Sequence, residues 1–440
     1  MEWWQIGLIS MAILIILILM RLPVAFGLGL LGLVLMAVLW RGTSGLNVAG
    51  STAFRSVGTF ILSAVPLFIL MAEILTFTGQ TEKAFAAVDK LFGTARGAAA
   101  FSTIVGSVIF GAISGFSPAT CAVFASIAIP EMVRRGYSKR LACGLVGGTA
   151  ALDILIPPSV LMVLYGGFGD VSIGRLFFAG MIPGLMGGIL LMGFVIVWSV
   201  VYPASVPQGE GGGTLRERLG GLVHLLPLMI MIFVVLGTIY FGVCTPTEAA
   251  SLGTLGALVL AAFNRRLNWP NLRSALFRSV EVNCMLFTVV VGASLFTAVL
   301  TYLQVPVHLS HAVTALPYSR WWIIIAMMFV ILIMGCFLDP GSIICLTTPI
   351  FVPAVKALGF DPLWYGVLLM INAEVATLTP PVGLNLFILM NAVDRREIST
   401  SDVILGVYPF VGFHILNMLL IMVFPQLALW LPTLMKGAGG

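Results

Sequence analysis

Charge is the scarcest property of this 440-residue sequence. Only 9% of its residues are charged, whereas an ordinary soluble domain has roughly 25%. So few charges cannot cover a surface that faces water. Hydrophobic residues make up 60% of the chain, and many runs approach the about 20 apolar residues that a membrane span needs. The sequence therefore predicts an all-α polytopic protein whose solvent is the lipid bilayer.

Cysteine and histidine are also scarce, with six and four residues. The cysteines show no CxxC spacing, and His308 and His311 have no third ligand nearby, so no disulfide framework or metal centre is predicted. Walker loops, nucleophile elbows and HExxH motifs are missing, which leaves ATP hydrolysis and proteolysis without support. The net charge of +5 comes from short basic clusters between apolar segments. That pattern is typical of membrane topology and not of nucleic-acid binding.

A single offset of 223 residues relates the two halves of the chain. The matches involve proline, glycine and arginine, so they do not arise from the general likeness of apolar helices. They join Pro23 to Pro246, residues 54–57 to 277–280, Pro130 to Pro353, Gly136 to Gly359, and residues 157–158 to 380–381. We interpret them as a duplication. Residues 1–205 form the first repeat, 206–222 a cytoplasmic linker, and 223–440 the second repeat.

The basic residues are distributed in opposite ways in the two repeats. Four follow Pro130 in the first repeat, where the second has only Lys356. Conversely, residues 265–278 hold four arginines where the first repeat has two. Because basic loops remain in the cytoplasm, the bias predicts two repeats of inverted topology. Five spans and one re-entrant hairpin per repeat satisfy that inversion, which gives about ten spans and two hairpins.

The ends and connectors follow from the same rule. The first positive charge, Arg21, comes after the first apolar run, so we expect a periplasmic N-terminus and no cleaved signal peptide. The segments 41–55 and 264–278 are too polar to span, and we expect each to lie along the membrane interface as an arm.

Two segments in each repeat are interrupted where a simple span would be continuous. Glycine, serine and proline break residues 106–130 near 114–118, and residues 335–353 are broken at 339–342. Irregular backbone at membrane depth persists only where it is buried or lines a cavity, so we expect two hairpins with functional tips. The proline pairs at 157–158 and 380–381 predict broken helices. Their carbonyls can coordinate a cation, and their half-helix N-termini can face an anion.

Several acidic residues lie in apolar surroundings, where a charge is costly. Asp339, at the second hairpin tip, is the first candidate for cation binding. Asp153 and Glu374 precede the two proline pairs and are second candidates. For both of them a structural hydrogen-bonding role stays open.

Together these motifs resemble the large membrane subunit, DctM type, of the tripartite ATP-independent periplasmic (TRAP) transporters. The resemblance rests on the segments GAISG at 111–115, IPEM at 129–132, IPPS at 156–159, LD at 338–339 and TPPVGLNLF at 379–387. It covers essentially the whole chain. The sequence departs from the family pattern at Phe116, Pro118 and Asp153.

The resemblance implies an elevator-type transporter in the inner membrane of a bacterium or archaeon. It also implies coupling to Na⁺, a small four-helix membrane subunit of the DctQ type, a periplasmic substrate-binding protein, and an organic anion as substrate, mostly a carboxylate. One implied sodium site comprises Ser114, Ser117, Thr120, Gly147, Gly148 and Thr149, and the other comprises Asp339, Ser342, Thr379 and Pro381. The implied substrate contacts are Ser114, Gly115, Ser159, Gly341, Gly383 and Asn385.

Other functions stay open at this point. A stand-alone sodium- or proton-coupled carboxylate symporter would need no binding protein. A channel is disfavoured because the spans carry no rings of charge. An intramembrane enzyme should show acid, base or metal clusters, and the sequence has none at suitable spacing. The sequence does not identify the substrate or the sodium stoichiometry.

Overall fold

The computed structural model describes residues 3–435 apart from 21, 41, 210–219, 221, 222, 224, 381, 382 and 395. Pro381, most of the expected linker 206–222, and two arginines used for the topology, Arg21 and Arg41, therefore lie outside the described residues. Within the described part every regular element is a helix.

The helices of the first half run from the N-terminus to a short turn before the expected linker. They are α1 (Trp3–Leu19), α2 (Val24–Leu39), α3 (Thr43–Val57), η1 (Phe60–Ser63), α4 (Ala64–Phe77), α5 (Gln80–Phe92), α6 (Ala98–Ser114), α7 (Ser117–Arg134), α8 (Lys139–Ala150), α9 (Val160–Gly169), α10 (Ile173–Val201) and η2 (Pro203–Ser205).

The second half begins beyond residue 224. Its helices are α12 (Leu226–Tyr240), α13 (Pro246–Phe263), α14 (Trp269–Tyr302), α15 (Val305–Ala315), α16 (Arg320–Gly335), α17 (Pro340–Ala357), α18 (Pro362–Thr377), α19 (Leu384–Ala392), α20 (Thr400–Val423) and α21 (Gln426–Thr433).

The helix order of the first half recurs in the second at the 223-residue offset. Helices α7 and α17 both begin and end at positions separated by this offset. One difference is that α14 is a single helix, whereas its equivalent is divided into α3, η1 and α4. The division follows Gly58, the C-cap of α3, and the equivalent position holds Glu281. Glycine weakens a helix by about 1 kcal/mol relative to alanine while glutamate favours it. The expected arm at 264–278 is therefore not a separate helix.

Six helical segments in the described part are long and apolar enough to cross a membrane. They are Phe60–Phe77, Ile173–Val201, Pro246–Phe263, Trp269–Tyr302, Pro340–Ala357 and Thr400–Val423, and five shorter apolar helices accompany them. The described part of the chain is therefore all-helical, and the chain has the composition of a polytopic membrane protein.

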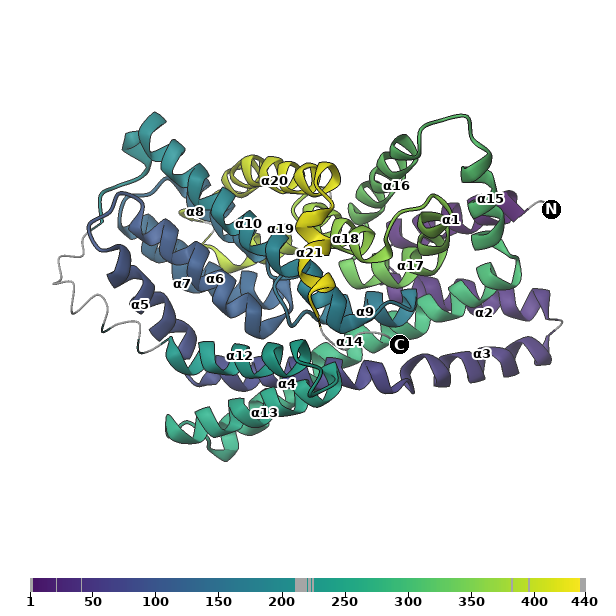
Figure 1. Cartoon of the computed structure of the whole chain (residues 1–440), viewed down its shortest axis with the longest axis horizontal. Coiled ribbons are helices and arrows are strands. Elements are labelled where there is room, and N and C mark those ends of the chain that lie inside the picture. Colours follow the sequence, from purple (N-terminus) through teal and green to yellow (C-terminus); the bar gives the residue numbers. More distant parts are fainter. Residues whose placement is uncertain are drawn as a thin grey trace.

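Two groups of helices meet along one surface. The edge layer, defined here as α2, α3, α4, α12, α13 and α14, lies along the lower edge of the molecule in Figure 1. In this layer α2 packs on α14 and α13 packs on α4. The hairpin layer, defined as α6–α9 and α16–α19, contains both interrupted segments of each half. It contacts the edge layer through α4 with α6 and α9, and through α14 with α17.

Close helix approach holds the edge layer together. A Cβ added at Gly292 of α14 would lie 2.2 Å from the Ala25 carbonyl oxygen of α2. One added at Gly32 would lie 2.8 Å from the backbone of Leu295. Small residues let membrane helices pack backbone against backbone. In lipid the hydrophobic effect does not drive helices together, so dispersion contacts between closely packed helices stabilise their association. The α2–α14 crossing is therefore closely packed, and α14 also contacts α17 of the hairpin layer.

Candidate functional site

The tip of the first hairpin is a two-residue turn pressed against the first helix break. Helix α6 ends at Ser114 and α7 begins at Ser117. Between them Gly115 has φ +58°, and a Cβ there would lie 2.2 Å from the Pro158 carbonyl oxygen. The Val160 amide donates to the Gly115 carbonyl at 3.2 Å. Only glycine fits this position, since it alone adopts that φ without strain and leaves room for the neighbouring backbone.

Beside this tip, a buried polar cluster joins the two halves of the chain. The Ser117 hydroxyl donates to Glu374 Oε1 at 2.7 Å. Asn385 Nδ2 lies 3.2 Å from Glu374 Oε2 and 3.3 Å from Ser117 Oγ. Thr377 completes the cluster, with its hydroxyl 3.2 Å from Glu374 Oε2. All four side chains are buried, so the donors around Glu374 replace the water that a carboxylate would otherwise need.

The other polar residues at this tip are also enclosed. Ser114 Oγ and Thr120 Oγ1 lie 3.0 Å apart across the turn. Ser159 caps the N-terminus of α9, accepting from the Met162 amide at 3.4 Å. An added Cβ on Gly115 would lie 3.2 Å from Ser159 Cα. The structure thus brings Ser114, Gly115, Thr120 and Ser159 together, with Ser117 and Asn385 in the adjoining cluster.

At the second hairpin tip, Asp339 caps α17. Its carboxylate accepts from the Ser342 amide at 3.0 Å and from the Ser342 hydroxyl at 2.5 Å. A Cβ added to Gly341 would lie 3.1 Å from Asp339 Oδ2 and 3.9 Å from Leu161 of α9. Each hairpin therefore meets the broken helix of the other half, because α17 packs on α9 and α7 packs on α19.

A cavity of about 460 Å³ is lined by residues of the second tip and of the edge layer. Asp339 and Gly383, the N-cap of α19, both line it. None of the described lining residues is basic. They are Pro23, Val24, Ala25, Phe26, Cys284, Met285, Thr288, Val289, Gly335, Phe337, Leu338, Asp339, Gly383 and Leu384.

Of the three expected sodium ligands in α8, Gly147 and Gly148 pack toward α19 and α20. A Cβ on Gly147 would meet Leu389 at 3.0 Å, and one on Gly148 would meet the Phe410 side chain at 2.7 Å. The Gly148 carbonyl lies 2.8 Å from His414 Nε2. Thr149 donates to the Val146 carbonyl of its own helix at 3.1 Å.

The side chains of the second expected sodium site also hydrogen-bond to residues close to them in the chain. Thr379 donates to the Val375 carbonyl at 2.7 Å, within the turn that ends α18. Asp339 and Ser342 hydrogen-bond to each other as described above, and Pro381 lies outside the described residues.

The sequence reasoning missed Thr377 and His414. Both lie on apolar helices, and in each helix another polar residue three positions away could have indicated them. Thr377 is three residues after Glu374, which places the two on one helix face. His414 is likewise three residues before Asn417, which donates to the Pro183 carbonyl at 3.2 Å.

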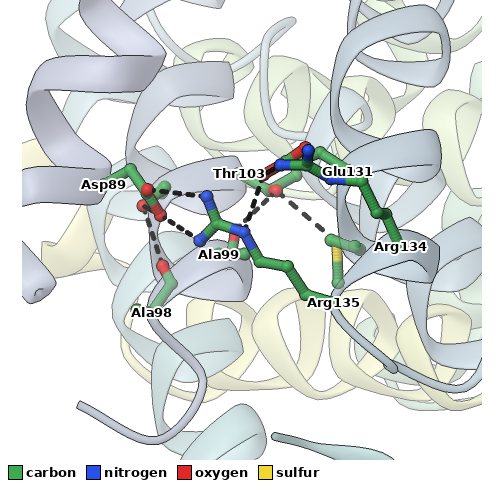
Figure 2. A network of polar contacts seen from close by, with 9 residues as sticks. Asp89, Ala98, Ala99, Thr103, Glu131, Arg134 and Arg135 are labelled. Carbon is green, nitrogen blue, oxygen red and sulfur yellow. Dashed lines mark hydrogen bonds and ion pairs between the residues drawn. The ribbon is translucent and has the colours of Figure 1, made fainter. Parts of the chain in front are cut away.

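Figure 2 shows an ion network that fixes the other end of α7. Arg135 donates to both Asp89 oxygens at 2.9 Å and to Glu131 at 2.7 Å. Arg134 adds a second contact to Glu131 at 2.7 Å. The bidentate pair joins α5 to the end of the first hairpin, and such paired geometry is stronger and more directional than a single contact.

Known proteins with a similar sequence or a similar fold identify the family of this chain. The C4-dicarboxylate TRAP transporter large permease protein DctM of Pseudomonas aeruginosa is 34% identical over 381 residues, which cover 86% of this chain and 88% of that protein. The ectoine TRAP transporter large permease protein TeaC of Halomonas elongata is 31% identical over 375 residues, covering 85% and 86%. The solved structure of Neisseria gonorrhoeae MtrF, at 13% identity, has a TM-score of 0.60 over 88% of this chain and 85% of that chain, a likeness of fold. Residues 11–427 match the family described as tripartite ATP-independent periplasmic transporter, DctM component, and this chain therefore belongs to the DctM family of TRAP transporter large permeases.

Proposed function

We propose that this permease performs sodium-coupled uptake of a small carboxylate delivered by a periplasmic binding protein. It works in the inner membrane with a small four-helix subunit of the DctQ type. Its two repeats are inverted, with about ten spans, two re-entrant hairpins and a periplasmic N-terminus. The hairpin layer slides against the edge layer as an elevator. Relatives are named for C4-dicarboxylates and for ectoine, so family membership alone does not define the cargo.

The observation that carries the proposal is the cavity between the two layers. It is within the size range of small-molecule sites, roughly 300–1,000 Å³. Asp339 and the N-terminus of α19 both reach it. A helix N-terminus attracts an anion, through its free amides and its dipole. The Asp339 carboxylate repels one, and the described lining supplies no basic side chain.

Sodium coupling follows from that balance of charge. An organic anion enters favourably only when a cation neutralises Asp339, so binding of the two is mutually reinforcing. This is positive coupling between two ligands, and each raises the affinity of the other by the same factor. The candidate ligands near Asp339 are oxygen atoms, including the Ser342 hydroxyl, and hard cations prefer oxygen ligands.

The test is the sodium dependence of uptake by the reconstituted complex with Asp339→Asn. Asparagine is as good an N-cap as aspartate, so α17 stays intact and only the charge is lost. We expect normal membrane insertion with a sodium response that is lost or shifted to much higher concentration. An unchanged sodium titration would remove Asp339 from the site.

A stand-alone symporter is the alternative within the same superfamily. It is favoured if the purified chain transports substrate at the full rate without the binding protein and the small subunit. Strict dependence on both partners supports the three-component proposal.

A further inference from the structure

A second cavity, of about 300 Å³, lies between α15, α16 and α17, away from both hairpin tips. Its lining includes Leu309 and Val313 of α15, Trp322 and Val330 of α16, and Phe351 of α17, and no charged residue of the described chain lines it. Trp322 is 67% exposed and Val330 is 44% exposed. The cavity is therefore an apolar groove that opens at the surface of the helix bundle, and we call it the lateral groove.

The first repeat shows why the lateral groove is open. At the 223-residue offset, Trp322 corresponds to Ala99 and Phe351 corresponds to Ala128. Both alanines are 0% exposed, and α5 packs on α6 in that repeat, whereas the equivalent α15 packs on α17. Small residues let helices approach closely, and large ones hold them apart. The bulky residues of the second repeat thus leave a space between α15 and α16.

The ion network of Figure 2 is also confined to the first repeat. There the two hydrogen bonds between Arg135 and Asp89, each of 2.9 Å, hold α5 against the end of the hairpin. The equivalent positions in the second repeat are Leu358 and Ala312, which cannot form an ion pair. The contact that ties α5 to its hairpin therefore has no counterpart at α15.

The length of the lateral groove matches one leaflet of a bilayer. Trp322 and Val330 are eight residues apart on α16, which is about 12 Å at 1.5 Å per residue. The hydrocarbon core is about 30 Å thick, so one leaflet supplies about half of that depth. An acyl chain of one leaflet therefore fits the groove, whereas a helix that crosses the membrane would extend far beyond it. Tyr318 and Trp322 line one end, and such residues gather at the level of the lipid headgroups.

Two cationic side chains lie at this end of the hairpin. The Arg320 guanidinium, at the start of α16, is 4.9 Å from the centre of the Phe360 ring. A Cβ added at Gly359 would lie 3.6 Å from Arg320 Nη1, and Lys356 is in the last turn of α17, one turn before Gly359. Arg320 and Lys356 are both exposed, and the ion pairs of the described chain include neither. This end of the groove therefore attracts an anion.

One acidic residue follows α17 before α18 begins. Asp361 caps α18, and its carboxylate accepts from the Leu363 amide at 2.7 Å. That helix N-terminus partly compensates its charge. Two cations therefore face one carboxylate that is already engaged, and the end of the groove keeps a positive balance.

We propose that the lateral groove binds one anionic phospholipid, with an acyl chain along α16 and the headgroup phosphate beside Arg320 and Lys356. Arginine presents several donors that suit phosphate oxygens, and basic pockets between membrane helices bind anionic headgroups. The lipid fills the space between α15 and the second hairpin, so it replaces the packing and the ion contact that the first repeat has there. This site is separate from the proposed transport of a carboxylate.

The test is native mass spectrometry of the delipidated full-length chain during a lipid titration. The two probes are phosphatidylglycerol and phosphatidylethanolamine with the same acyl chains, so that only the headgroup charge differs. The double variant Arg320→Gln/Lys356→Gln removes the cations, and Lys356→Gln alone removes the one that is not stacked on a ring. Ala326→Phe fills the groove, because Ala326 lines it.

Each variant has a matched control elsewhere in the chain. Arg273→Gln removes another exposed arginine that stacks on a ring, 5.4 Å from the centre of Phe277. Ala262→Phe adds the same bulk at an exposed alanine of α13.

We expect the wild-type chain to bind its first phosphatidylglycerol at least about tenfold more tightly than phosphatidylethanolamine. The double variant loses this preference and keeps its affinity for phosphatidylethanolamine, and Lys356→Gln loses part of it. Ala326→Phe weakens the binding of both lipids, because the acyl chain has no space. Both controls behave as wild type.

Three results would overturn the inference. Equal affinity of the wild-type chain for the two lipids would mean that the headgroup charge is not recognised. A preference that persists in the double variant would place the anionic lipid elsewhere. If Ala326→Phe leaves lipid binding unchanged but abolishes association with the small subunit or with a second copy, the groove holds a protein. None of these results affects the sodium titration that tests the proposed function.

Discussion

Replacing Gly115 with alanine should disable the first hairpin. A left-handed conformation costs an L-residue about 1–2 kcal/mol. The new Cβ would lie 2.2 Å from the Pro158 carbonyl oxygen, whereas real Cβ contacts essentially never fall below 3.0 Å. The tip must therefore retract from the helix break, which disrupts the Val160–Gly115 hydrogen bond, worth about 0.5–1.5 kcal/mol. The total destabilisation is about 2–3 kcal/mol.

Gly136→Ala isolates the backbone term of this estimate. Gly136 has φ +88°, and a Cβ there meets nothing within 4 Å. The control variant therefore incurs the left-handed strain alone, about 1–2 kcal/mol. The difference between the two variants measures the contact of the tip with the break.

The assay is initial uptake by the reconstituted complex, with thermal unfolding of the full-length chain beside it. Misplacing a binding group by about 1 Å can lower a rate by about a hundredfold. We expect Gly115→Ala to lose uptake about ten- to hundredfold, and Gly136→Ala to retain it. Equal losses of uptake and stability in the two variants would refute the packing argument.

Three further predictions concern other contacts. Gly292→Ala should destabilise the chain by about 1–3 kcal/mol through overpacking at the α2–α14 crossing, whereas Gly193→Ala, which meets nothing within 4 Å, should be neutral or stabilising in the same unfolding measurement. Arg135→Lys loses the bidentate geometry and should lower stability by about 1 kcal/mol, and an unchanged unfolding midpoint would contradict a fixing role for the network. Ser117→Ala removes a donor to Glu374 and should reduce sodium-driven uptake more than the amount of protein in the membrane, as measured by uptake per inserted molecule; a parallel fall in both would contradict a role in transport.

Much of the element order could be predicted from the sequence, because proline and glycine act locally. The hairpin turns at Gly115 and Asp339, and the gaps before α9 and α19, are where the residue pattern places them. Gly58 indicates the break between α3 and α4 in the sequence itself. The expectation of two equivalent arms did not take this glycine into account. The matching Glu281 is compatible with a continuous helix, so α14 runs through.

The partners of the site residues could not be predicted in the same way. Ser117 contacts Glu374 and Asn385, more than 250 residues away in the chain. An internal repeat tells which positions are equivalent but not which surfaces touch. The glycines at 147 and 148 illustrate this limit, because glycine serves equally for cation coordination and for close packing. Here Phe410 occupies the space beside Gly148.

The most direct test of the account concerns the inversion of the two repeats. Arg134 and Ala357 are exposed, end equivalent helices and are separated by the 223-residue offset. Single cysteines placed there, in a chain whose exposed Cys284 is replaced by serine, can be labelled in intact cells with a membrane-impermeant maleimide. We predict labelling at position 357 from outside and labelling at 134 only after the membrane is opened. Labelling of both positions from the same side would contradict the inverted duplication.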